Sequence, residues 1–310
     1  MNSFQRKCPT FTSWEEARDH AQVRCLYRSL RQQDKLAFQL AAGNNASGTL
    51  QLHSLLPRNA LQDEVINLWF DLLKKQHSLD GETLFFDCTF FDCLYANGSG
   101  YGGGDGVSWV KEKKIKIFRA KKVFIPANCD NIQWYLLVID VEQKTVEVHD
   151  FLAQSKYPFQ KYLLDFLKEL FFDCYNQSLK HEDWTFRTVD CLRQQDSCDS
   201  GVYICMLADW ISRGVLPSTD DGVRTWDDDS VKMLRGNIAL GIITGEIREV
   251  TPIEGIKAQP EVRIADLDDD ESGDPWEPYG NSCDPWADAD HVAKEQAAEI
   301  KPDLEGKLNL

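Results

Sequence analysis

The sequence predicts an α+β domain, a central mixed sheet flanked by helices. Segments with the pattern of β-strands cluster in the middle of the chain, where β-branched and apolar residues dominate. Segments with apolar residues at helical spacing precede and follow this cluster. The 310 residues, 43% of them apolar, are enough to bury one substantial core. This order of elements predicts neighbouring strands that pair, with helices packed around them.

The N-terminal residues 1–50 predict a helical extension. Ser13 and Glu16 have the spacing of an N-terminal capping box. Apolar residues then recur at roughly helical spacing, which predicts one helix over residues 14–42. The run of Gly, Asn and Ser at 43–48 should end this helix.

Four segments follow before the central strands. Residues 63–75 predict a helix, whose apolar stripe consists of Val65, Leu68, Trp69 and Leu72. Residues 84–95 fit a packed helix or a strand, and the sequence leaves this choice open. The glycine-rich run 98–106 predicts an exposed loop, because it lacks the Lys-Ser/Thr pair of a phosphate-binding loop. The basic run 111–122 alternates with apolar residues and predicts a strand-edge surface, with a localisation signal as the alternative.

The centre of the domain has the sequence pattern of strands, and the part that follows has the pattern of helices. Strands are expected at 122–126, 134–140 and 145–150, and helices at 157–175, 201–213 and 231–246. The third strand alternates apolar and polar residues, as a half-exposed strand should.

The charge distribution argues against a nucleic-acid partner. The net charge is −16, and from Thr251 onward 16 acidic residues face 5 Lys or Arg. Phosphate binding requires clustered cations, which a chain of this charge lacks. No apolar run is long enough for a membrane span, so no membrane partner is expected. The N-terminus lacks the apolar core of a secretory signal, which predicts a nuclear or cytoplasmic location.

The ten cysteines predict neither disulfides nor a metal site. Their spacing is irregular and contains no Cys-x-x-Cys pair. Without an export signal, reduced thiols are expected. The cysteines with apolar neighbours should be small buried side chains: Cys88, Cys93, Cys174, Cys191 and Cys205. No cofactor or metal is therefore expected.

Two segments carry a family resemblance. These are residues 131–140, which continue to ValHisAspPheLeu at 148–152, and residues 194–206, GlnGlnAspSerCysAspSerGlyValTyrIleCysMet. With them the chain resembles the SUMO-specific or ubiquitin-like-protein-specific proteases, the cysteine peptidases related to adenain. Residues 61–67 and 208–213 are similar to further helices of this family. The resemblance covers residues 53–248 and implies a papain-like, adenain-like protease fold.

The resemblance implies a site in which a His directly before a Trp is the general base. An Asp at the end of the next strand orients it, a Cys in an Asp-Cys-Gly turn is the nucleophile, and a Gln six residues earlier helps to hold the oxyanion. The positions that match this pattern are Trp134, Asp150, Gln194, Asp199 and Gly201. Asp63 belongs to the first helix of the resembling region and is expected to border the substrate.

Three positions depart from the family pattern. Gln133 occupies the base position and Ser200 the nucleophile position. Ala60 stands where the family has a Trp that roofs the tunnel for the Gly-Gly tail of the substrate. A glutamine amide cannot accept a proton usefully near neutral pH. A serine hydroxyl is a far weaker nucleophile than a thiol and depends on such a base.

These departures predict a pseudoprotease that retains affinity for SUMO, ubiquitin or another ubiquitin-like protein without cutting it. An active isopeptidase with another arrangement is the alternative. Cys198 could replace the nucleophile only with Gln194 and Gly201 out of register, and is expected to be structural. His149 is adjacent to Asp150 in a strand and is expected to point away from the site.

The C-terminal residues 260–310 predict an acidic, disordered tail, because they have too few apolar residues for a core. Asp-Pro-Trp occurs twice, and Trp276 and Trp286 are candidate partner anchors, as in endocytic adaptor-appendage ligands. The alternative is a solvated tail with two incidental tryptophans. Residues 262–267, which precede a run of acids, resemble a SUMO-interacting motif. A scaffold that acts through this tail is a third functional hypothesis.

Overall fold

The computed structural model of the chain divides into two compact units, residues 1–260 and 261–310. The described residues, all in the first unit, are 10–31, 51–77, 81–99, 106–129, 133–152, 157–189, 192–196, 198–215, 224–247, 249–250, 252 and 256–257. Both tail tryptophans, the motif at 262–267, Cys191 and most of the glycine-rich run lie outside these residues.

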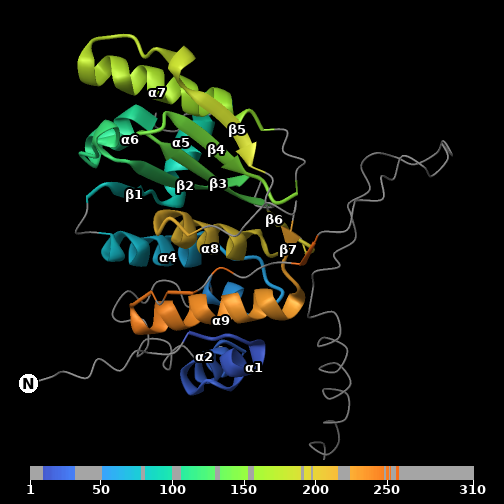
Figure 1. Cartoon of the computed structure of the whole chain (residues 1–310). Helices are drawn as coiled ribbons and strands as arrows, with labels where there is room; N and C mark the ends of the chain where they lie inside the picture. Colours follow the sequence, from blue (N-terminus) through green and yellow to red (C-terminus); the bar gives the residue numbers. More distant parts are fainter. Residues whose placement is uncertain are drawn as a thin grey trace, which may run out of the picture. The chain divides into compact units, whose positions relative to one another are not determined.

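A five-stranded mixed sheet forms the centre of the domain (Figure 1). Its strands, in spatial order, are β1 (Thr83–Phe85), β2 (Lys122–Cys129), β3 (Gln133–Asp140), β4 (Thr145–His149) and β5 (Thr185–Val189). The three central strands pair antiparallel, as short connections require, whereas each edge strand pairs parallel. The predicted mixed sheet and its three central strands are confirmed.

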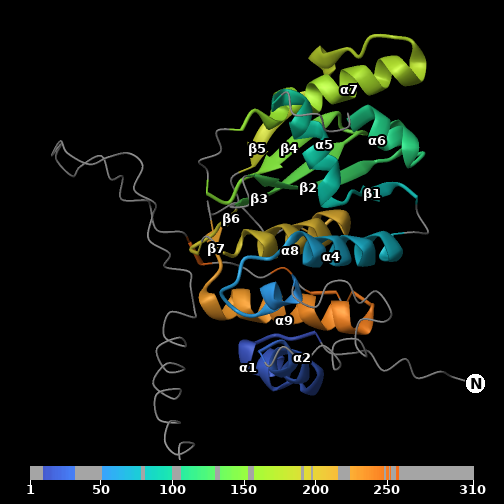
Figure 2. The ribbon, with the colours of Figure 1, turned by 180° about the vertical axis from the view of Figure 1, so that it is seen from behind.

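Strand β3 is buried along its whole length because helices cover both faces of the sheet. Trp134 and Leu136 face one core cluster, and Tyr135 and Leu137 face the other. Figures 1 and 2 show the two helical layers on opposite sides of the sheet. A strand buried on both faces is apolar at successive positions, as residues 134–139 are.

One face of the sheet carries three helices. They are α5 (Cys88–Ser99), α6 (Gly106–Glu112) and α7 (Phe159–Tyr175). Residues 84–95, which fitted a helix or a strand, contain both, since β1 ends at Phe85 and α5 follows. The basic run 111–122 is not a strand edge: it covers the end of α6, the 3₁₀ turn η2 (Ile117–Arg119) and the first residue of β2. Its alternation reflects side chains that anchor a loop rather than one face of a strand.

The opposite face carries α8 (Ser200–Ser212), with α4 (Asp63–Gln76) beside it and α9 (Asp228–Thr244) in the next layer (Figure 1). Buried residues occupy α8 from Ser200 to Ile211, as expected of a helix enclosed on all sides. The indole N–H of Trp69 donates to the Cys205 carbonyl (2.9 Å) and so joins α4 to α8. The predicted stripe of α4 is wrong at Leu68, which is 37% exposed.

The single N-terminal helix predicted over residues 14–42 is wrong in its described part, whereas residues 32–42 lie outside the described residues. It is divided into α1 (Trp14–Asp19) and α2 (Ala21–Arg31), because His20 has an extended ψ of 125°. Ser13 does cap α1, accepting the backbone N–H of Glu16. The carboxylate of Glu16 accepts from the backbone N–H and the hydroxyl of Thr12. Apolar positions continue at helical spacing across the break, so the sequence pattern conceals it.

Short elements complete the described residues. They are η1 (Gln51–Leu55), η3 (His181–Asp183) and a small sheet of β6 (Leu192–Arg193), β7 (Arg224–Thr225) and β8 (Ile256–Lys257). The seven described cysteines are free thiols. Cys174 is exposed and Cys93 is only half-buried, contrary to the expected burial. Among the described residues, no helix is long and apolar enough to span a bilayer, and no group of three potential ligands could hold a metal.

Candidate functional site

The N-terminus of α8 lies against the first residues of β3, and this contact forms the candidate site. Ser200 begins the helix, and its hydroxyl oxygen accepts a hydrogen bond from the backbone N–H of Trp134 (3.1 Å). The indole N–H of Trp134 donates to the Leu61 carbonyl (2.8 Å), which fixes the ring beside the segment that leads into α4. The site therefore joins three parts of the chain that are distant in sequence.

Gly201 allows this close approach. A Cβ at this position would lie 2.7 Å from Cβ of Leu61 and 3.3 Å from Cδ1 of Trp134. Side-chain atoms do not tolerate such separations, so a larger residue would displace the Leu61 segment or α8. The glycine of the nucleophile turn is thus required by packing as well as by the family pattern.

The variant Gly201→Ala is expected to lower the free energy of unfolding by about 1–3 kcal/mol, the usual range for an overpacked core. Urea unfolding followed by tryptophan fluorescence measures the change. Glu169→Ala, at an exposed position of α7, is the matched control and should change stability by less than about 0.5 kcal/mol. An unchanged midpoint for Gly201→Ala would show that the contact with Leu61 is looser than the structure has it.

Gln133 and Gln194 form a reciprocal amide pair. The Nε2 of Gln194 donates to Oε1 of Gln133 (3.0 Å), and the Nε2 of Gln133 lies 3.5 Å from Oε1 of Gln194 in the reverse bond. Both side chains are buried, at 4% and 8% exposure. The amide that the resemblance assigns to the oxyanion is therefore bonded to the residue at the base position.

Asp150 is buried directly after β4, and its carboxylate accepts the backbone N–H of Leu152 (3.0 Å). The next residue, Phe151, accepts the backbone N–H of Gln194 at its carbonyl (3.0 Å). The turn after β4 is thus connected to the amide pair through the backbone. Asp150 lies one residue away from this connection.

Asp199 precedes α8 and pairs with Arg235 of α9. The guanidinium donates to the carboxylate of Asp199 (3.1 Å) and to the carbonyl of Ser54 (2.7 Å). Burial raises the pKa of Asp199, and Arg235 partly opposes this rise. Arg235 is only 1% exposed, and sequence reasoning missed it. The signal available was a single cation in an otherwise apolar part of the predicted helix 231–246.

Two further predicted residues lie where the chain enters α4, and of these Ala60 borders the site. Ala60 is exposed and directly precedes Leu61, which contacts both Trp134 and Gly201. Asp63 begins α4, and its carbonyl faces the Cys88 thiol (3.9 Å). The small side chain of Ala60 provides no ring at this border.

The prediction that the side chain of His149 points away from the site requires correction. His149 is opposite Leu136 in the β3–β4 register, and Leu136 packs in the core that contains α8. Directly opposed side chains share a face, so the imidazole lies on the α8 face of the sheet. Its Nε2 lies 3.4 Å from Glu147, and the described contacts of Ser200 include no histidine. His149 is therefore close to the site but is not the base of Ser200.

Glu147 is the most perturbed carboxylate near this face. Its contact with His149, followed by the ion pair with Arg187, holds the pKa of Glu147 at about 2, against the effect of burial. A lowered folded-state pKa stabilises the fold above the ordinary value of 4.5, and this stabilisation is lost as the pH falls toward 2.

The variant Glu147→Gln is expected to lose roughly 1 kcal/mol of stability at neutral pH, after allowance for the solvent that screens the exposed Arg187. The difference from the native chain should shrink between pH 4.5 and pH 2. Urea unfolding across this range measures it, with Glu142→Gln in an exposed turn as the control. A difference that does not depend on pH would exclude the carboxylate charge as its cause.

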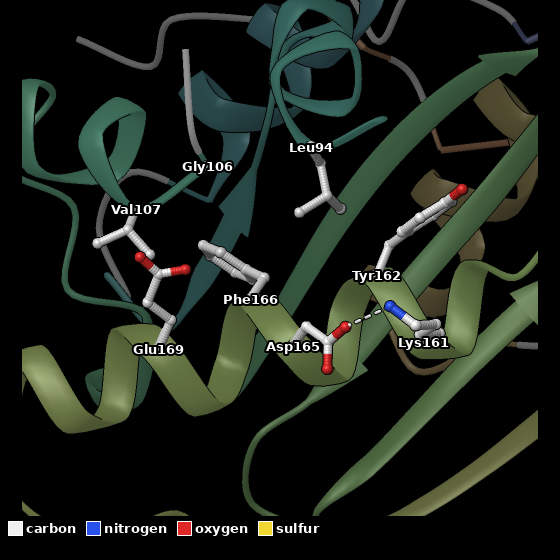
Figure 3. A pocket seen from close by; sticks show the side chains of 8 residues that line it. All are labelled: Leu94, Gly106, Val107, Lys161, Tyr162, Asp165, Phe166 and Glu169. Carbon is white, nitrogen blue, oxygen red and sulfur yellow. Dashed lines mark hydrogen bonds and ion pairs between the residues drawn. The ribbon is translucent and has the colours of Figure 1, made fainter. Parts of the chain in front are cut away.

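A hollow of about 150 Å³ lies on the other side of the sheet, between α5, α6 and α7 (Figure 3). Leu94 and Phe166 line it, and Lys161 pairs with Asp165 at its border (2.8 Å). The helices that line it cover the face of the sheet opposite α8. The hollow is therefore separate from the candidate site.

Comparison with known proteins identifies the family. The model of the Ulp1 protease family, C-terminal catalytic domain, matches residues 59–245. The chain belongs to this family. The resemblance inferred from residues 131–152 and 194–206 is thereby confirmed.

Individual Ulp1-family relatives are similar over about half of the chain. Ubiquitin-like-specific protease 1 of Saccharomyces cerevisiae is 28% identical over 154 residues, 49% of this chain and 23% of the relative. Sentrin-specific protease 2 of Homo sapiens is 28% identical over 159 residues, 49% of this chain and 26% of the relative. The matched region spans about a quarter of the length of these relatives.

Solved structures of the Ulp1 family confirm the predicted fold. The SUMO protease Ulp1, with its catalytic cysteine oxidized to a sulfinic acid, matches with a TM-score of 0.53 and 27% identity, covering 70% of this chain and 94% of that one. The Ulp1-like SUMO protease catalytic domain of Chaetomium thermophilum matches with a TM-score of 0.57 and 20% identity, covering 73% and 90%. The second likeness is one of fold alone.

Proposed function

We propose that this chain is a catalytically silent member of the Ulp1 family, which binds a ubiquitin-like protein without cleaving it. The observation that carries the proposal is the reciprocal pair of Gln133 and Gln194. In this pair, the side-chain N–H of Gln194, the oxyanion donor of the family pattern, donates to Gln133, the residue that replaces the general base. One of the two N–H donors of Gln194 is therefore engaged and is not free for a developing oxyanion.

The chemistry of Ser200 supports the same conclusion. A serine hydroxyl attacks a carbonyl only when a neighbouring base removes its proton. The oxygen of Ser200 instead accepts the Trp134 amide, and Gln133 has no basic lone pair to offer. Removal of triad members lowers rates by up to about a million-fold. We therefore expect no useful turnover.

The class of partner follows from the family. The relatives named above are proteases specific for ubiquitin-like proteins, and the similar solved structures are SUMO proteases. SUMO, ubiquitin or another ubiquitin-like protein is thus the partner of this domain. Without a ring at Ala60, affinity comes from broad surface contact rather than from a grip on the C-terminal tail.

Two measurements on the full chain test the proposal. In the first, fluorogenic C-terminal derivatives of SUMO and of ubiquitin are offered, and the native chain should release no more fluorophore than Ser200→Ala. Turnover that Ser200→Ala abolishes would overturn catalytic silence. In the second, calorimetry with intact SUMO and ubiquitin should detect binding at micromolar concentration. Heats indistinguishable from dilution for both proteins would remove the binding role.

A further inference from the structure

Three aromatic rings, of Phe118, Phe171 and Tyr175, contact one another where the C-terminal end of α7 meets η2, and exposed Phe172 follows Phe171 on the same helix. We call them the α7 aromatic patch: Phe118, Phe171, Phe172 and Tyr175. Three exposed cations of the neighbouring segment form a cationic rim: Lys114, Lys116 and Arg119. We propose that the patch and the rim bind an acidic peptide segment of a partner protein through an aromatic or aliphatic anchor residue.

The patch is exposed and preformed. Phe172 is 57% exposed and Tyr175 49%, the largest values among the exposed large apolar side chains that the structure describes. Phe118 packs edge-to-face on Phe171 (5.2 Å between ring centres), and Phe171 lies 4.8 Å from Tyr175. Phe118, Phe171 and Tyr175 are held by one another and so lose little conformational freedom on binding. Exposed aromatic side chains of this kind are typical anchors of protein interfaces.

The rim is uncompensated, unlike other cations of the same segment. Lys111 pairs with Asp173, and Lys113 pairs with Asp87. The three rim residues make no ion pair with any described residue. Lys116 and Arg119 also lie within two residues of Phe118 in the sequence, on either side of it.

Lys114 has a backbone conformation that usually belongs to glycine. Its φ of 56° lies in the left-handed region, and its N–H donates to the Lys111 carbonyl where α6 ends. A side chain at such a position is disfavoured by its Cβ. Arg58 and Lys144 have the same left-handed conformation, so the contribution of Lys114 to the rim is its exposed charge rather than its backbone.

An acidic peptide fits this surface better than the other occupants. A second copy placed symmetrically would bring two cationic rims together, and like charges repel. A nucleic acid needs a track of cations along its backbone, whereas the rim holds three, on a chain of net charge −16. A short acidic segment balances three charges while its anchor residue covers the rings.

Fluorescence anisotropy of a labelled peptide tests the proposal on the full chain. The probe is a short peptide with one central Trp between glutamates, and its counterpart has lysines in place of the glutamates. The acidic probe should bind the native chain at least about tenfold more tightly than the lysine peptide. The double variant Phe172→Ala/Tyr175→Ala should weaken binding by at least about tenfold, as expected for anchor residues.

Charge variants and matched controls complete the test. Lys116→Gln/Arg119→Gln should weaken the acidic probe and reduce the salt dependence of its binding. Leu68→Ala and Arg28→Gln, exposed positions on α4 and α2, should leave the affinity unchanged. Equal binding by the aromatic double variant would overturn the proposal. So would tighter binding of a single-stranded oligonucleotide than of the peptide, or a dimer in sedimentation that the aromatic variant dissociates.

Discussion

The double variant Gln133→His/Ser200→Cys is expected to cleave a fluorogenic ubiquitin-like substrate at least about a hundredfold faster than the native chain. A thiol has a pKa near 8.5, and an imidazole beside it together with the N-terminus of α8 would favour the thiolate. The triad chemistry of related sites contributes up to about a million-fold. We expect only part of this, because under the proposed function Ala60 provides no ring to hold the tail of a substrate.

Each single variant is expected to recover much less. Ser200→Cys alone leaves Gln133 in place, and Gln133 keeps the amide of Gln194 engaged (3.0 Å). Gln133→His alone provides a base but leaves a hydroxyl as the nucleophile. Residues that act as a unit are strongly non-additive, so the double variant should exceed the product of the two single effects.

Three controls make this result decisive. Addition of Ala60→Trp should increase turnover further, mainly through a lower KM. Alkylation with iodoacetamide should abolish the activity of the double variant, because it depends on the new thiol. If the double variant folds with native circular dichroism and remains silent with and without Ala60→Trp, then the assignment of the base and nucleophile positions fails.

The central strands and the long helices were predictable because their patterns are strong and local. Residues 134–139 are apolar on both faces, and residues 157–175 repeat at helical spacing. Strand β5 was not predicted, because three of its five residues are polar and exposed, the other two are only partly buried, and its place at the sheet depends on pairing with β4. The break at His20 was hidden because the apolar period continues across it.

The candidate site was likewise predictable only in part. The ordered motifs indicated Gln133, Gln194 and Ser200, but not that the two glutamines would bond to each other across 61 residues of chain. Side-chain pairing of this kind depends on tertiary distances that no local pattern encodes. The side of the sheet on which His149 lies likewise depends on strand register rather than on its neighbour in sequence.

Replacement of Arg235 by alanine is expected to destabilise the fold by about 3–5 kcal/mol, the largest stability effect predicted for the chain. The side chain is 1% exposed and joins α9 to the Ser54 carbonyl and to Asp199 before α8. Its loss leaves a largely buried carboxylate without its cation and a backbone carbonyl without its donor. Urea unfolding measures the change, with Lys180→Ala at an exposed position as the control.

Comparison with Asp199→Asn and with the double variant Arg235→Ala/Asp199→Asn separates the stability lost through the unpaired charge from the stability lost through packing. If the unpaired carboxylate causes the loss, Asp199→Asn in the Arg235→Ala background should restore part of it, because a neutral amide is less costly to bury than a charge.

The pH dependence gives an independent test. Burial already raises the pKa of Asp199, and loss of the guanidinium should raise it further. A raised folded-state pKa gives stability that is present at low pH and is lost as the pH rises through it. The deficit of Arg235→Ala should therefore be smaller near pH 4 than at pH 7, whereas a deficit equal at both would indicate lost packing as its cause.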